Sequence, residues 1–297
     1  MKKNILKLIT SCTIAFSLFN FTVQAQNKER VTFGIDLTDA QEAQMLKEFG
    51  VSGNEVTVDR ITNDDIIKQL GLDPNDKSNY EGGCYSSSYV NLTNNGGIQV
   101  QSNNLTEVTS LMLSNALVTS GITNAEVKAS SPFPVTGTSA LSGILKGFES
   151  AKGEELSLKN KKTAQEEIET TSALGEEIGY DEAAKVINDV KTKVIKEAPK
   201  SSEEISQIVE DVTKNYTVQI SDDQKQQIKA LMSDINDLDI DYNTVKETLK
   251  NISNQISEVL KNSGKDIQDS SFFQGIFDAL GKFFSKLFDS IKNIVNN

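Results

Sequence analysis

The spacing of apolar residues changes near residue 152, and this change decides the fold class. Between residues 26 and 152, short stretches in which apolar and polar residues alternate are interspersed with stretches of helical spacing. From residue 153 onward the alternating stretches nearly vanish, and apolar residues recur three or four positions apart with charged residues between them. We therefore predict an α+β protein in which a mixed α+β module with a small sheet precedes an α-helical region that ends in an amphipathic helix.

The first region, residues 26–152, contains signals for both strands and helices. Strands are predicted at residues 31–36, 55–61, 85–93, 98–102 and 125–129, and helices at residues 63–70, 106–120 and 138–151. A further helix begins at the capping box of Thr38 and Gln41 and ends at Gly50. The turn-forming run at residues 94–97 predicts that the strands on either side of it form a β-hairpin.

The second region, residues 153–270, is predicted to be a helical bundle. Helical apolar spacing with a charged opposite face recurs over residues 163–174, 180–197, 202–214, 222–236 and 242–262, before a last helix at residues 271–297. A helix with one apolar stripe must bury that stripe against a neighbour, so these segments are expected to pack on one another.

The last predicted helix, residues 271–297, places nearly all its apolar side chains within an arc of roughly 160°. Such a stripe packs on a membrane surface, on a partner protein or on the chain's own bundle. Charged residues on the opposite face would each cost about 2.5 to 3.5 kcal/mol at the bilayer centre, so at a membrane we expect the helix to lie in the interface. The predicted contact residues are Phe273, Phe277, Leu280, Phe284, Leu287, Phe288 and Ile291.

Residues 1–25 have the layout of a signal peptide. Lys2 and Lys3 precede an apolar stretch at residues 5–23, and Ala25 completes a small-x-small cleavage pattern. We predict cleavage after Ala25, so that the chain is secreted or belongs to the extracellular cell envelope. An uncleaved anchor and lipidation at Cys12 are the alternatives, but polar residues interrupt the apolar stretch and its main part follows Cys12.

Cleavage would leave 27 basic and 42 acidic side chains, a net charge of about −15. This charge disfavours nucleic acid as a partner and also repels an anionic membrane surface. Cleavage would also leave a single cysteine, so no disulfide can form within the chain. Cys84 is predicted to be a small buried strand residue, with a reactive thiol or pairing between molecules as the alternatives.

The sequence contains no histidine, which excludes Ser-His-Asp and Cys-His mechanisms and zinc sites built with histidine. No Ser-x-x-Lys motif is present, neither acidic loop at residues 73–77 or 234–238 matches an EF-hand, and no cofactor motif is found. Acidic doublets such as Glu166-Glu167 are expected on solvated helix faces. We therefore predict no catalytic residue, cofactor or metal site, and keep a carboxylate-dependent hydrolase of wall or extracellular polymer as the alternative.

The segment at residues 132–143 is the best candidate for a ligand site. Two prolines hold an extended approach, a glycine permits a turn, and hydroxyl residues begin a helix whose first amides can bind an anion. The candidate ligand residues are Thr136, Gly137, Thr138 and Ser139. Alternatively the hydroxyl groups cap the helix, and Gly143 lets the helix lie close to the sheet.

Several blocks in this order resemble one family. They are residues 37–41 with 49–51, residues 115–122, residues 132–143 and residues 171–179, and together they resemble the YpuA-like family of secreted proteins (domain of unknown function 1002). The resemblance covers most of the chain after the signal peptide. It implies an extracellular or envelope protein of a Gram-positive bacterium and supplies no catalytic residues.

We therefore predict an exported, non-catalytic binding or structural protein of the cell envelope or extracellular space. Its terminal helix is expected to contact a membrane surface, a partner protein or its own bundle. The identity of any small-molecule ligand stays open.

Overall fold

The computed structural model describes residues 28–264. The predicted signal peptide and the predicted terminal helix with its apolar contact residues lie outside this range. The α+β class is confirmed: a mixed five-stranded sheet is followed by a helical region. The strands are β1 (Glu29–Gly34), β2 (Thr57–Ile61), β3 (Ser87–Leu92), β4 (Ile98–Leu105) and β5 (Ala125–Val135). The helices are α1 (Asp39–Phe49), α2 (Asn63–Leu70), the 3-10 helix η1 (Lys77–Tyr80), α3 (Ser110–Thr119), α4 (Ala140–Lys152), α5 (Leu158–Ile178), α6 (Tyr180–Glu197), α7 (Ser202–Thr213), α8 (Asp222–Asn236) and α9 (Tyr242–Asn262).

The sheet has the strand order β2-β1-β3-β5-β4, and the predicted hairpin of β3 and β4 is wrong. The chain does turn at residues 94–97, with positive φ at Gly96 and Gly97. However, β5 lies between β3 and β4 in the sheet, so the two strands that this turn connects are not neighbours. β4 pairs with β5 in parallel, and α3 connects them as a crossover helix. Because β5 also pairs antiparallel with β3, Val127 of β5 lies beside Val90 of β3 and both face the core.

Local end signals confirm most predicted helices. Thr38 and Thr62 make the capping boxes of α1 and α2, and α1 ends at left-handed Gly50. α3 begins later than predicted, at residue 110 instead of 106. The reason is that the amides of Thr106 and Glu107 donate to the backbone at the end of β5.

β5 is longer than predicted, because it continues through two prolines to Val135. Its pairing with β3 ends at Ser130, which lies opposite Ser87. Pro132 and Pro134 therefore lie beyond the stretch in which β5 must donate amides to β3, where proline is tolerated.

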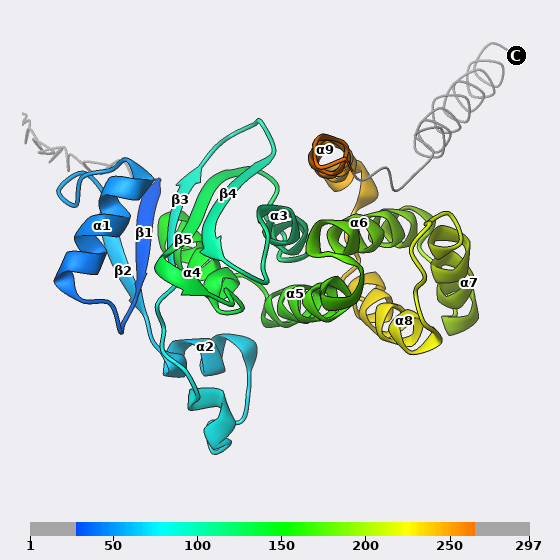
Figure 1. Ribbon diagram of the computed structural model, residues 1–297, viewed down its shortest axis with the longest axis horizontal. Helices are drawn as coiled ribbons and strands as arrows, with labels where there is room; N and C mark the ends of the chain where they lie inside the picture. The colour runs from blue at the N-terminus through cyan, green and yellow to red at the C-terminus, as the bar shows by residue number, and fades with distance from the viewer. Residues whose placement is uncertain (1–27, 265–297) are drawn as a thin grey trace, which may run out of the picture.

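The two faces of the sheet are covered differently (Figure 1). On one face, α1 packs over β1 and β3 through a small core that includes Phe33, Met45 and Phe49. On the other face, α4 lies against β1 and β3. A Cβ at Gly147 would lie 3.0 Å from the hydroxyl oxygen of Thr32, so glycine permits this close approach.

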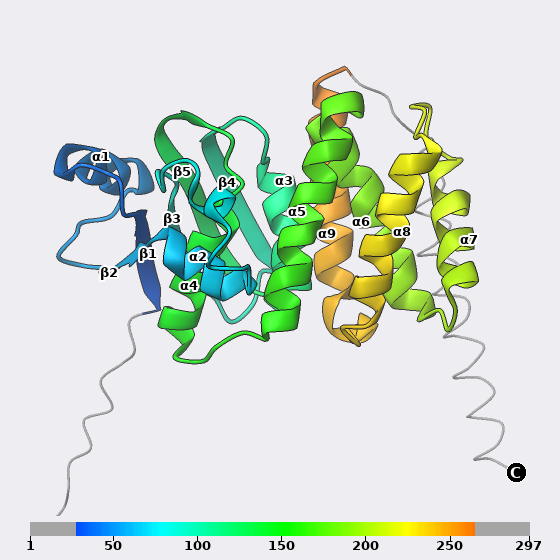
Figure 2. The ribbon, with the colours of Figure 1, turned by 90° about the horizontal axis from the view of Figure 1, so that it is seen from below.

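The helical region packs on the sheet layer through α3, which contacts α5, α6 and α9 (Figure 2). One core cluster contains Val127 of the sheet, Leu113 of α3 and Ile187 of α6. The division of the chain at residue 152 stays a prediction. Within residues 28–264, no helix is both long enough and apolar enough to cross a membrane.

Two buried charge clusters lie on α6. The Lys191 ammonium, fully buried, donates to a Glu167 carboxylate oxygen at 2.6 Å and to the Asn115 carbonyl at 2.9 Å. Thr119 of α3 donates to the other Glu167 oxygen. These contacts join α3, α5 and α6.

In the second cluster, Lys185 and Tyr216 both donate to the carboxylate of Asp189. Burial raises the pKa of Asp189, and the nearby Lys185 ammonium opposes this effect.

Candidate functional site

The face of the sheet that α1 covers stays open over β4 and part of β5. α1 ends at Phe49, and its last turn lies over the middle of β5. There the Lys128 ammonium donates to the Phe49 carbonyl at 2.7 Å and lies 5.4 Å from the centre of the Tyr89 ring. A cation at the C-terminus of a helix is favourable, so Lys128 holds the end of α1 in place.

The strand register arranges the open side chains in rows across the strands. We call this surface the sheet shelf; it consists of Asn91, Gln99, Gln101, Asn103, Glu126 and Lys128 of the strands and Thr93 just after β3. Gln99 lies opposite Glu126, and Gln101 lies opposite Lys128. Gln99, Gln101 and Asn103 are exposed at every second position of β4, as expected for one face of a strand. The shelf is therefore rich in amides along the outer strand.

Glu48, in the last turn of α1, borders the shelf on one side. Its carboxylate accepts from the Ser130 hydroxyl at 2.5 Å and from the Asn103 side-chain amide at 3.0 Å. These bonds show that Asn103 and Ser130 face α1. Since Gln99 and Gln101 alternate in step with Asn103, they share this face.

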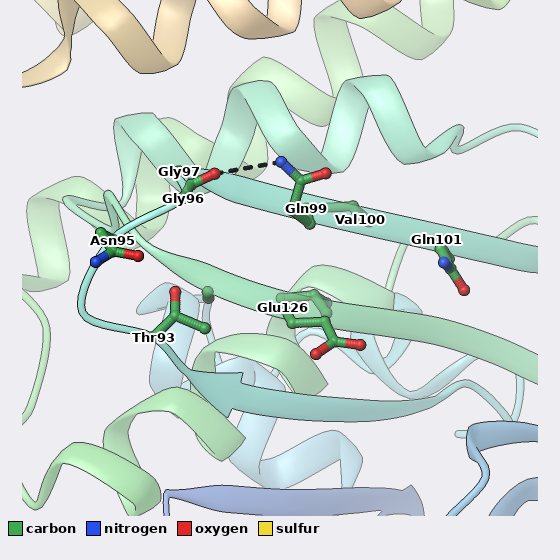
Figure 3. Close-up of a pocket in the computed structure, with 10 residues that line it drawn as sticks. Thr93, Asn95, Gly96, Gly97, Gln99, Val100, Gln101 and Glu126 are labelled. Carbon is green, nitrogen blue, oxygen red and sulfur yellow. Dashed lines mark hydrogen bonds between the residues drawn. The ribbon is translucent and has the colours of Figure 1, made fainter.

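A hollow of about 430 Å³ lies at the other end of the shelf, between the loop after β3 and strands β4 and β5. Figure 3 shows Thr93, Asn95, Gln99, Gln101 and Glu126 around it. Gln99 is held by a hydrogen bond from its amide to the Gly96 carbonyl at 3.3 Å. The Thr93 hydroxyl is buried and has no hydrogen-bond partner among the described residues. The hollow thus offers amides and a carboxylate to a ligand.

The predicted ligand residues at the start of α4 lie elsewhere. Thr136 and Thr138 are exposed, Ser139 is half-buried, and Gly137 is buried with a φ of 89° against Leu105. The Thr136 carbonyl accepts from Glu107 and the Thr138 carbonyl from Gln165, so the segment joins the loop after β4 and helix α5 to α4. The Ser139 side chain makes no capping bond, which contradicts the capping alternative for this residue. A Cβ at Gly143 would lie at an ordinary contact distance of 3.6 Å from the Ser88 hydroxyl oxygen, so the close approach of α4 to the sheet lies at Gly147 instead of Gly143.

Cys84 is buried, as predicted, but it precedes β3 instead of lying within it. Its thiol lies 2.8 Å from the Asn63 side-chain oxygen, and its amide donates to Asp36. Burial, with a smaller effect of the Asp36 carboxylate, raises the pKa of the thiol to about 11. Thiolate is therefore scarce at neutral pH, which argues against a reactive role.

We expect Cys84 to react slowly with a thiol reagent while the chain is folded. In the chain from residue 26 onward it is the single thiol. Labelling with Ellman's reagent at pH 8 should be at least about tenfold slower in buffer than in denaturant, because folding removes both access and thiolate. Equal rates in the two conditions would contradict the burial of this thiol.

Among residues 28–264, no group of three or more acidic or cysteine side chains is arranged to hold a metal ion. The two most deeply buried acids among the described residues, Glu167 and Asp189, are each paired with a lysine. The sheet shelf, by contrast, has the composition of a surface that holds a ligand by hydrogen bonds.

Comparison with known proteins gives the family. The family model described as "Protein of unknown function (DUF1002)" matches residues 33–252, which is most of the chain. The chain belongs to this family. It is also 30% identical over 265 residues to "Uncharacterized protein YpuA" of Bacillus subtilis (strain 168), covering 89% of this chain and 88% of that protein. No solved structure matches the chain significantly. The resemblance inferred from sequence blocks is thereby confirmed, and the DUF1002 match includes β3 to β5 and the whole sheet shelf.

Proposed function

We propose that this DUF1002 protein is an exported, non-catalytic binding protein of the cell envelope, whose ligand lies on the sheet shelf. The observation that carries the proposal is the open row of amides on β4 beside a hollow that the loop after β3 and Glu126 also line. Exposed primary amides both donate and accept hydrogen bonds, so a ligand with hydroxyl or amide groups can bond to them along the strand.

The layout of the N-terminus supports export, and the apolar stripe predicted at residues 271–297 supports a second contact. In this proposal the terminal helix holds the protein at a membrane surface or on a partner, while the shelf holds the ligand. The two surfaces have different chemistry, because one is apolar and the other is rich in amides.

The hydrolase alternative has less support. Glycoside hydrolysis by two carboxylates requires that the two groups face each other across a cleft, about 5 to 9 Å apart. Glu126 is the carboxylate that lines the hollow among the described residues, and its neighbours there are amides, a hydroxyl and small or aliphatic residues. This arrangement favours holding a ligand over cleaving it.

Cell fractionation tests the export half of the proposal, and wall retention tests the shelf. We expect the protein in the wall or medium fraction, and we expect the purified chain from residue 26 onward to sediment with purified cell walls. The double variant Gln99→Ala and Gln101→Ala should reduce the retained fraction several-fold, since it removes two exposed amides from the shelf.

Gln226→Ala is the matched control, because Gln226 is an exposed amide on α8, which packs on other helices and away from the sheet. It should leave retention unchanged. Detection of the protein in the cytoplasm alone would overturn export. Equal retention of the shelf variant and the control would overturn the shelf as the binding surface.

A further inference from the structure

An aromatic pair extends the sheet shelf beyond Asn103. The ring centres of Tyr85 and Phe133 are 5.0 Å apart and the rings are tilted by 60°. Tyr85 packs against the core under α1, which places the pair on the same face as the shelf. Phe133 is 37% exposed. Part of the Phe133 side chain is therefore accessible to a ligand on this side of the sheet.

A register irregularity explains why Phe133 is presented there. Asn103 lies opposite Ser130, but Leu105 lies opposite Val135, so β5 has extra residues facing a short piece of β4. Such a bulge bends the strand and redirects its side chains. From Gln99 to Asn103 the strand extends about 13 Å, and the register places Phe133 of β5 between the levels of Asn103 and Leu105. The whole surface is thus elongated along β4.

We infer that the ligand of the sheet shelf is a neutral glycan chain that lies along β4. This inference rests on the proposed binding function and names its ligand class. Hydroxyl and acetamido groups of the chain hydrogen-bond to Gln99, Gln101 and Asn103, and one sugar ring packs on Phe133. At the other end the chain enters the hollow beside Asn95 and Glu126.

The hydrogen-bonding chemistry supports a glycan. A sugar hydroxyl both donates and accepts, and a primary amide side chain also does both, so the two kinds of group match in any order along the strand. The C–H groups on a sugar face carry slight positive charge and pack well on the negative face of an aromatic ring. Gln99, Gln101 and Asn103 together with the exposed ring of Phe133 supply both kinds of contact.

The charges on the surface disfavour anionic polymers. Glu48 and Glu126 are both at the shelf, and the chain has a net charge of −12, so an anionic polymer is repelled. The Lys128 ammonium is bound to the end of α1. A lipid surface needs a larger apolar patch than one exposed phenylalanine provides. A cationic peptide is the class that competes with a glycan, because Glu126 could attract it.

Calorimetry with chitohexaose, a neutral hexamer of N-acetylglucosamine, tests the inference on the chain from residue 26 onward. We expect binding, and we expect Phe133→Ala and Gln101→Ala each to weaken it roughly five- to tenfold. Phe133→Leu keeps an apolar side chain without a ring and should be as weak as Phe133→Ala. Gln226→Ala should bind like the unsubstituted chain. Equal thermal unfolding midpoints for the variants and the unsubstituted chain would show that the substitutions do not disrupt the fold.

The outcomes separate the ligand class from the proposed function. Full affinity of Phe133→Leu would overturn the role of the ring. Absence of chitohexaose binding, with binding of pentalysine that Glu126→Gln weakens, would overturn the glycan while the shelf remains the binding surface. If walls retain the protein but no shelf variant changes that retention, the shelf itself is not the site, and the proposed function fails with the inference.

Discussion

Replacing Lys191 with alanine is expected to lower the free energy of unfolding by about 3 to 5 kcal/mol. The substitution leaves the Glu167 carboxylate buried without its cation and removes donors from the Asn115 carbonyl and the Thr119 hydroxyl. An uncompensated buried charge is strongly unfavourable. Urea unfolding of the chain from residue 26 onward, followed by circular dichroism, measures the effect.

Two controls separate the buried charge from lost packing. The double variant Lys191→Met with Glu167→Leu removes both charges and keeps apolar volume, so it should recover most of the lost stability. Lys193→Ala breaks a looser ion pair with Asp211, 3.6 Å long and partly exposed, and should change stability by less than about 1 kcal/mol. A loss at Lys191→Ala as small as that at Lys193→Ala would show that the buried pair contributes little.

Replacing Gly34 with alanine should disrupt the sheet. A Cβ at Gly34 would lie 1.9 Å from the Cys84 carbonyl oxygen and 2.4 Å from its carbon, and both atoms are backbone. The segment cannot move away easily, because Gly34 donates to Ser86 and Asp36 donates to Cys84. We expect a loss of about 3 kcal/mol or more, beyond the usual penalty of overpacking, and a lower yield of folded protein.

Gly53→Ala is the matched control for this substitution. Its Cβ would meet only the end of the flexible Leu46 side chain, at 3.3 Å. The expected change in stability is within about 0.5 kcal/mol. Thermal unfolding of the two variants side by side decides the point, and equal midpoints would contradict the close backbone approach at Gly34.

The helix ends could be predicted because their signals are local. The capping boxes of Thr62 with Asp65 and of Ser221 with Gln224 each lie within four residues. The structure accordingly gives α2 and α8 the predicted bounds. Such side-chain to backbone bonds need no distant partner, so a single sequence contains all the information about them.

The strand pairing could not be predicted in the same way. The turn at residues 94–97 favours a hairpin locally, yet β3 pairs with a strand that begins at Ala125. The side-chain pattern of β3 suits either partner. The position of α3 determines which strand pairs with β3, because the almost wholly buried surface of α3 must lie between the sheet and the bundle. That position is visible only in three dimensions.

The buried charges and the sheet shelf were missed for a related reason. Lys191 and Glu167 look like ordinary charges of helical faces, and the backbone partner of Lys191 at Asn115 is 76 residues away. The alternating amides of β4 are visible in the sequence, but they also suit a plain solvated strand. Their significance depends on where α1 ends, because Phe49 marks the border between the covered and open parts of the sheet.

The place of β5 between β3 and β4 has a consequence for the order in which the chain can assemble as it leaves the ribosome. β1 can pair with both β2 and β3 once residue 92 has emerged. β4 then follows without a partner in the sheet, and it remains so until residues 125–135 are synthesised and enter between it and β3. A nascent chain that stops before residue 125 therefore presents unpaired edges on β3 and β4, which makes it prone to aggregate.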